Sequence, residues 1–168
     1  MGSQAFSGSP ASAEARAALD AIRRIVRMLR ESSGAAERRA GVSGAQLFVL
    51  QQLRSRGAAL SLRALAERTA THESSVSVVV QRLVDAGLVA RRRSREDARR
   101  VELSLLPAGR ALLRRAPPLA QEKLIAALER LEARERRSLA RSLEALVARL
   151  GLAAQPPAMF FEGASRGR

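Results

Sequence analysis

The sequence predicts a mainly helical protein with one small β-hairpin. Apolar residues recur at i, i+3, i+4 and i+7 over most of the chain, which is the pattern of helices with one buried face. Between about residues 88 and 105 this period changes to two, as in strands. The chain has 168 residues, 46% hydrophobic but only 2% aromatic. We therefore expect one domain with an aliphatic core.

Residues 1–12 are rich in Gly, Ser, Ala and Pro, and we expect them to be disordered. The first helix begins near Ala13. Its apolar face consists of Ile22, Ile25, Val26 and Leu29. Ser32-Ser33-Gly34 is expected to end this helix, which leaves Ala35–Val42 as a connector that contains Gly41.

Three more helices follow in the pattern. Ser43 is a plausible N-cap for a helix over 44–56, which Gly57 ends. Ser61 caps a short helix, Leu62–Arg68, and a polar turn over 69–71 leads to a helix from His72 to Ala86. The inward face of this last helix comprises Val76, Val79, Val80 and Leu83.

The hairpin is predicted from two short strands around a charged loop. Leu88-Val89-Ala90 is apolar, and Val101, Leu103 and Leu105 alternate with polar residues. Between the strands, residues 91–100 hold six Arg and two acids.

Helical periodicity resumes at Pro107, which suits a first helical turn, and runs to about Leu131. Pro117-Pro118 should kink or break this stretch. A last helix is expected over 133–150. Its apolar stripe consists of Leu139, Leu143, Leu146, Val147 and Leu150. Residues 151–168 are expected to form a flexible tail, in which Met159-Phe160-Phe161 can dock.

Charge and composition narrow the function. Lys and Arg total 30 against 16 acidic residues, a net charge of +14, which favours an acidic partner: nucleic acid before an anionic membrane surface. The absence of cysteine excludes disulfides and thiol chemistry. With His72 as the one histidine and no glycine-rich phosphate loop, we predict no enzyme, no cofactor and no metal site. No apolar window approaches a membrane span of about 20 residues, and the N-terminus lacks a secretory pattern. We expect a cytoplasmic protein.

Two short helices joined by a tight turn and followed by a basic hairpin make a winged helix-turn-helix. The second helix is slim enough to enter a major groove, which is about 12 Å wide. An arginine at the hairpin tip suits a narrow minor groove, where the potential is most negative.

The sequence here resembles the MarR (multiple-antibiotic-resistance regulator) family of winged helix-turn-helix regulators, over about Ala13–Leu150. Four stretches at the family's spacing carry the resemblance: Ser61–Arg68, Ser74–Leu83 followed by Asp85–Val89, Asp97-Ala98-Arg99, and Val101–Gly109. Leu106 departs from the family's usual threonine, which weakens the expected cap of the next helix.

The resemblance implies a homodimer on pseudo-palindromic double-stranded DNA. Its N-terminal dimerisation helix and connector span 13–42, its DNA-binding region 43–106, and its C-terminal dimerisation helices 107–150. The apolar stripes at the two ends of the chain need a cover, which is either a second subunit or each other within one chain.

The resemblance also implies that the helix at about 72–86 enters the major groove and that the wing at about 88–105 reaches the minor groove. On this helix, the residues expected to face outward and contact DNA are Ser74, Ser75, Ser77, Val78, Gln81 and Arg82. Serine hydroxyls can bond base edges or phosphates, Val78 can meet a thymine methyl group, and Gln81 can bond adenine. Glu73 favours the helix N-terminus, or alternatively accepts from a cytosine amino group.

In the wing, Arg99 matches the family's minor-groove arginine, Asp97 matches the acid that holds the wing, and Arg95 is expected to contact phosphate. Arginines 91–93 either touch DNA or form a solvated strand. The family further implies a transcriptional regulator, expected to be a repressor, that a small aromatic or phenolic anion releases from DNA. A regulator without a ligand, an activator, and a nonspecific architectural DNA-binding protein are the alternatives.

Overall fold

The computed structural model describes residues 12–54, 59–93, 101–155 and 157–161. Their elements, in chain order, are α1 (Ala13–Ala40), α2 (Gly44–Arg54), β1 (Leu60–Ser61), α3 (Leu62–Arg68), α4 (Glu73–Asp85), β2 (Val89–Arg93), β3 (Val101–Leu105), α5 (Pro107–Arg115), α6 (Ala120–Arg130) and α7 (Ala133–Arg149). The predicted disorder of residues 1–12, apart from Ser12, and the predicted helix stop at Gly57 lie outside the described residues.

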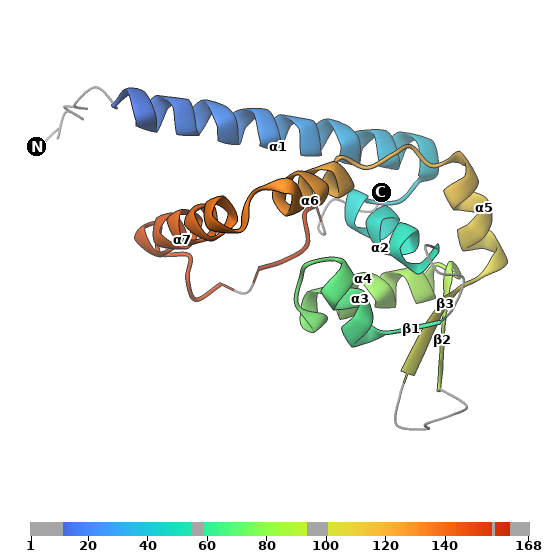
Figure 1. Ribbon diagram of the computed structural model, residues 1–168. Coiled ribbons are helices and arrows are strands. Elements are labelled where there is room, and N and C mark those ends of the chain that lie inside the picture. The colour runs from blue at the N-terminus through green and yellow to red at the C-terminus, as the bar shows by residue number, and fades with distance from the viewer. Residues whose placement is uncertain (1–11, 55–58, 94–100, 156, 162–168) are drawn as a thin grey trace, which may run out of the picture.

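Two parts of the molecule are distinct in Figure 1. The elements α2 to α5 and the small sheet gather at the C-terminal end of α1. The N-terminal half of α1 and helix α7 extend away from that group, with α6 between. The mainly helical fold with a small β element is confirmed. Among the described residues, no helix is long and apolar enough to cross a membrane.

Helix α2 forms the centre of the core, because nine of its eleven residues are buried. Its Leu47, Phe48 and Leu50 are fully enclosed, and α3 contributes Leu65. A helix that is apolar on nearly all sides is stable only when other elements surround it. This central helix therefore fixes α3 and α4 against the scaffold of α1 and α5.

Two predicted helix caps are confirmed. Ser43 Oγ accepts a hydrogen bond from the Gln46 amide at 3.2 Å, and Gln46 Oε1 accepts one from the Ser43 amide at 2.9 Å. This reciprocal pair satisfies two backbone donors at the start of α2. Ser61 Oγ accepts from the Ala64 amide at 3.1 Å and so caps α3. Leu106 precedes Pro107 and provides no side-chain cap, as its apolar side chain requires.

The predicted end of the first helix is wrong, because α1 continues through Gly34 to Ala40. The residues expected to form a connector carry the contacts that hold this extension. Ala36 and Ala40 are buried, and Ser33 Oγ accepts a hydrogen bond from the Gly44 amide at 3.3 Å. Burial against α2 outweighs the cost of about 1 kcal/mol for a glycine inside a helix. Gly41, with φ +70°, ends α1 instead.

The wing is a three-stranded antiparallel sheet in the order β1-β3-β2, and not a two-stranded hairpin. Strand β1 was not predicted, because its two residues, Leu60 and Ser61, are too few to show a period. They pair with Leu103 and Glu102 of β3. Strand β2 pairs with the other edge of β3, with Arg91 opposite Leu103.

The C-terminal half follows the prediction closely. The helical stretch breaks at Pro117-Pro118 into α5 and α6. The Ala120 amide, at the start of α6, donates to Ser32 Oγ of α1 at 2.9 Å. Beyond α7, Gly151 adopts φ +70° and the chain turns back. The prediction that residues 151–168 form a flexible tail is wrong at Met159, because this residue is 4% exposed and belongs to the hydrophobic core cluster.

Candidate nucleic-acid interface

Helix α4 has one anchored face and one open face. Val76, Val79, Val80 and Leu83 are buried, as predicted from their spacing. They fix the helix on the core and leave its opposite side at the surface. Periodicity outweighs the poor helix propensity of valine here, since burial of an apolar face stabilises a helix more than propensity does.

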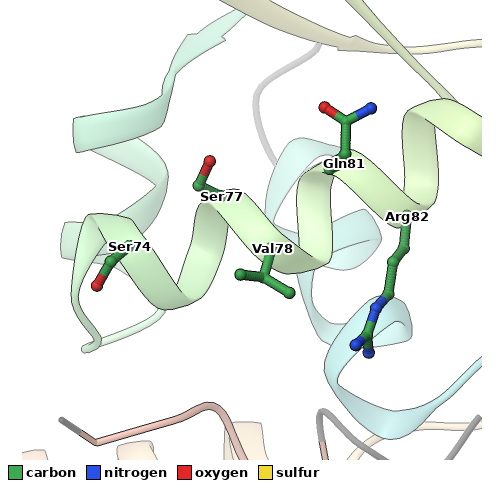
Figure 2. Close-up of a pocket in the computed structure, with 5 residues that line it drawn as sticks. All are labelled: Ser74, Ser77, Val78, Gln81 and Arg82. Carbon is green, nitrogen blue, oxygen red and sulfur yellow. The ribbon is translucent and has the colours of Figure 1, made fainter.

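The open face of α4 presents two rows of side chains around a shallow hollow. Ser74, Val78 and Arg82 form one row at i, i+4 and i+8, and Ser77 and Gln81 form the other (Figure 2). The first row spans about 12 Å along the helix axis, a length that several base pairs of a groove can match. Val78 is 44% exposed although it is apolar.

Gln81 is oriented by a neighbour on its own helix. Its side-chain nitrogen donates to Asp85 Oδ1 at 2.8 Å, one turn further along α4. This contact fixes the direction of the amide group. The Gln81 amide is therefore oriented within the chain before any DNA is bound.

The prediction that Ser75 faces outward is wrong. Ser75 is 8% exposed, and its hydroxyl donates to the backbone oxygen of Pro157 at 2.8 Å. The chain that follows α7 covers this side of α4. His72 occupies the N-cap position of α4, but its side chain makes no capping hydrogen bond. Glu73, in the first turn, is exposed, as suits an acid at a helix N-terminus.

The arginines of β2 alternate between two faces of the sheet. Arg91 lies directly opposite the buried Leu103, so its side chain is on the same face of the sheet as Leu103, the face on which the helices pack. Arg93 shares that face by the period of two. Arg92 lies opposite Glu102, and both side chains are on the other face of the sheet. All three arginines are exposed, and α4 packs against β2. The side of the sheet next to α4 is therefore basic.

The predicted contacts at the wing tip, Arg95, Asp97 and Arg99, lie outside the described residues. Within the described ranges, no group of three His, Asp or Glu side chains is placed to hold a metal ion.

Two apolar stripes remain at the surface of the single chain. On α1 they are Leu19, Ile22, Ile25 and Val26, and on α7 with its C-cap residue they are Leu139, Leu143, Leu146, Val147 and Leu150. Helix α7 buries none of its residues within the chain as described. The alternative that the two stripes cover each other within one chain is therefore wrong for this structure.

Comparison with known proteins places the chain in a family. Residues 40–100 match the model described as MarR family. An HTH-type transcriptional repressor of Mycobacterium tuberculosis is 33% identical over 99 residues, which cover 59% of this chain and 71% of the repressor. The chain belongs to the MarR family. The HTH-type transcriptional repressor MdtR of Bacillus subtilis is 39% identical over 69 residues, which cover 41% of this chain and 44% of MdtR. The match thus spans less than half of that relative.

Solved MarR-family structures share the fold. A MarR family transcriptional regulator from Streptomyces coelicolor, in complex with DNA, aligns with a TM-score of 0.57 at 22% identity. The alignment covers 88% of this chain and 98% of that regulator. The winged helix arrangement of the MarR family is therefore confirmed, from α1 to α7.

The sequence missed one part of this MarR-family site, namely the contact between the C-terminal segment and α4. The signal available was the apolar run Met159-Phe160-Phe161 after two prolines. This apolar run predicts that the segment packs against another part of the protein, but it does not indicate which surface the segment covers. Ser75 lies one and two turns before the buried Val79 and Leu83, at the edge of the inward face, and the contact with Pro157 covers it there.

Proposed function

We propose that this MarR-family protein is a dimeric, sequence-specific DNA-binding transcriptional regulator that represses by occupying a pseudo-palindromic operator. The observation that carries the proposal is the open face of α4. An anchored helix presents five side chains, polar but for Val78, beside a basic strand, and four of them are exposed while Ser77 is half-buried. Such a helix suits the width of a major groove.

In this proposal α4 reads bases and the wing supplies affinity. Val78 meets a thymine methyl group, and Gln81 bonds adenine, once its amide exchanges Asp85 for a base. Ser74, Ser77 and Arg82 hold base edges or phosphates. Ser75 supports the helix from behind and is not part of the contact face.

The wing places positive charge beside the same groove. Arg91 and Arg93 lie on the α4 side of the sheet and are placed to meet phosphates. At the wing tip, Arg95 contacts phosphate and Arg99 enters the minor groove, with Asp97 orienting its guanidinium group. These tip roles follow from the family resemblance.

The dimer is supported by the two exposed stripes on α1 and α7. Exposed apolar area of this kind marks an interaction surface in soluble proteins. Both stripes lie on the part of the molecule that extends away from the winged region (Figure 1). A second copy that covers them would place two α4 helices on one side of a duplex.

We further propose that a small aromatic or phenolic anion controls DNA release. Such a ligand would favour a spacing of the two α4 helices that no longer matches successive grooves. A regulator that works without a ligand is the alternative. We also propose a cytoplasmic location, where the duplex partner is found.

The competing function is nonspecific architectural binding, which the net charge of +14 alone would support. Selection of sites from a random duplex library at near-physiological salt separates the two. Enrichment of an inverted repeat with half-site centres about 10–11 base pairs apart is the expected result, because two recognition helices then enter successive major grooves.

A matched selection uses the double variant Val78→Ala, Gln81→Ala, which keeps every arginine. We expect it to lose or change the enriched repeat while it still binds random duplex. Binding without enrichment by the unmodified protein would favour the architectural function. Absence of binding, also after refolding to remove any ligand, would refute the proposed function.

A further inference from the structure

The segment that follows α7 returns to the rest of the molecule and contacts it at two places, the recognition helix α4 and the scaffold of α1, α2 and α6. Gly151 turns the chain, and residues 157–161 lie against α4 on one side and against the scaffold of α1, α2 and α6 on the other. We call residues 157–161 the C-terminal strap.

The first contact is with the recognition helix. The hydroxyl of Ser75 in the first turn of α4 donates to Pro157 O at 2.8 Å. Ser75 is 8% exposed whereas Pro157 is exposed, so this hydrogen bond is partly sheltered from water. Loss of the bond would leave the buried Ser75 hydroxyl without this acceptor, which costs free energy. The start of α4 is thereby tied to the backbone of the strap.

The second contact is with the scaffold. Met159 is 4% exposed and belongs to the hydrophobic core cluster to which α1, α2 and α4 all contribute. Phe160 and Phe161 line a hollow together with Leu29, Ser32 and Ser33 of α1, Gly44 of α2, and Leu119 and Gln121 next to and in α6. The hollow is narrow, because the volume open to a water molecule in it is about 10 Å³, enough for about one water.

We propose that the C-terminal strap is a positioning element that holds α4 in its DNA-reading orientation relative to the helices that carry the apolar stripes. Ser75 and Met159 are its positioning residues, and the strap itself does not touch DNA. The inference rests on the proposed function. Only residues 150–156 separate the strap from α7, so a short covalent path joins the helix with the longest exposed stripe to the segment that contacts the recognition helix.

The physical consequence is preorganisation. A recognition helix held in one orientation loses less freedom when it enters a groove than a helix that samples several. If release of the strap leaves α4 in the binding orientation about a tenth of the time, apparent operator affinity falls about tenfold. Affinity for random duplex depends mainly on charge and should change little.

The test compares Met159→Ser with two controls in the full chain. Ala158→Ser changes an exposed residue of the same strap, and Met159→Leu keeps an apolar side chain. Circular dichroism establishes that each variant is folded. Affinities for the selected operator and for random duplex are then measured at one salt concentration.

A second readout does not need DNA. The chain has no cysteine, so the pair Arg30→Cys, Gln81→Cys gives one spin label on α1 and one on α4. Labelled protein is diluted with unlabelled protein, so that the distance within one chain is measured. We expect a narrow distance distribution that Met159→Ser broadens and that the two controls preserve.

An unchanged distribution in folded Met159→Ser would overturn the positioning role, as would an unchanged ratio of operator to random affinity. A rise in operator affinity would also overturn it, since the strap would then restrain binding. If Met159→Ser does not fold, a chain that ends at Gln155 replaces it under the same criteria. If no operator exists for the unmodified protein, the proposed function fails, and the distance distribution still decides the role of the strap.

Discussion

Gly109 occupies a position in the winged region where no other residue fits. It lies in α5, and a Cβ at this position would collide with the backbone oxygen of Leu88. That oxygen also accepts a hydrogen bond from the Leu106 amide at 3.0 Å, which closes the base of the wing. The backbone cannot retreat without breaking this bond. The presence of glycine at position 109, in the stretch Val101–Gly109 that resembles the MarR family, therefore has a steric explanation.

We predict that Gly109→Ala lowers the free energy of unfolding by about 1–3 kcal/mol, the usual cost of an overpacked contact. Urea unfolding followed by circular dichroism measures it. Gly34→Ala is the matched control, because Gly34 lies inside α1 and faces mainly the flexible Arg38 side chain. There alanine should raise stability by up to about 1 kcal/mol. Equal effects of both changes would contradict the steric account.

Val78 is the residue for which base reading can be tested most directly. We predict that Val78→Ala weakens operator binding by about 1 kcal/mol or more, the cost of one poorly read base pair, and leaves random-duplex binding unchanged. Replacing single thymines by uracil removes only the methyl group. At one thymine of the operator, replacement by uracil should lower the affinity of the unmodified protein. The same replacement should not change the affinity of the Val78→Ala variant. A uniform loss across all sequences would show that Val78 does not read bases.

At the scale of an element, side chains of strand β2 point alternately to the two faces of the sheet, so its arginines are divided between these faces. Arg91 lies opposite an apolar residue on the α4 side, whereas Arg92 lies opposite Glu102 on the far side. Opposite charges at directly opposed ladder positions interact by roughly 0.2–1 kcal/mol, so Glu102 offsets part of the positive charge on the far face of the sheet. The sequence run Arg91-Arg92-Arg93 is thus not one uniform basic patch.

We predict that Arg91→Ala lowers the salt dependence of duplex binding by about one ion, a slope change of ~0.9. Arg92→Ala is the control on the same strand and should leave the slope nearly unchanged. Fluorescence anisotropy with a labelled duplex over a range of salt concentrations measures both. Equal slope changes for the two variants would mean that both faces of β2 contact DNA phosphates to the same extent.

At the scale of the whole molecule, the exposed stripes separate the part of the chain that would dimerise from the part that would bind DNA. The stripe of α7 occurs at i, i+4, i+7, i+8 and i+11, so its five residues share one side of the helix. Leu150 is 62% exposed in the single chain. This open stripe is the surface that the proposed dimer would cover.

We predict that Leu143→Arg converts a dimer to a monomer and lowers operator affinity about a hundredfold or more, since two linked half-sites then bind separately. The added positive charge would by itself strengthen nonspecific binding, so a loss cannot come from charge. Arg141→Gln, on the opposite side of α7, is the control. Sedimentation velocity and operator binding check both variants. A Leu143→Arg variant that stays dimeric would place the interface elsewhere.

The sequence by itself determined the features that depend on neighbours along the chain. The caps at Ser43 and Ser61, the break at Pro117-Pro118 and the buried valine face of α4 all follow from local hydrogen bonding, ring geometry or helical period. These causes act within a few residues, so they are visible in the order of the residues.

Tertiary structure alone decided the features that depend on distant contacts. Helix α1 passes Gly34 because Ala36 and Ala40 are buried in the core, and β1 exists because β3 offers it an edge. Ser75, at the edge of the inward face of α4, is covered by a segment 82 positions away, where Pro157 accepts its hydrogen bond. Burial and hydrogen bonding between distant segments outweigh local preference at these places, and the pattern around each residue holds no record of the partner.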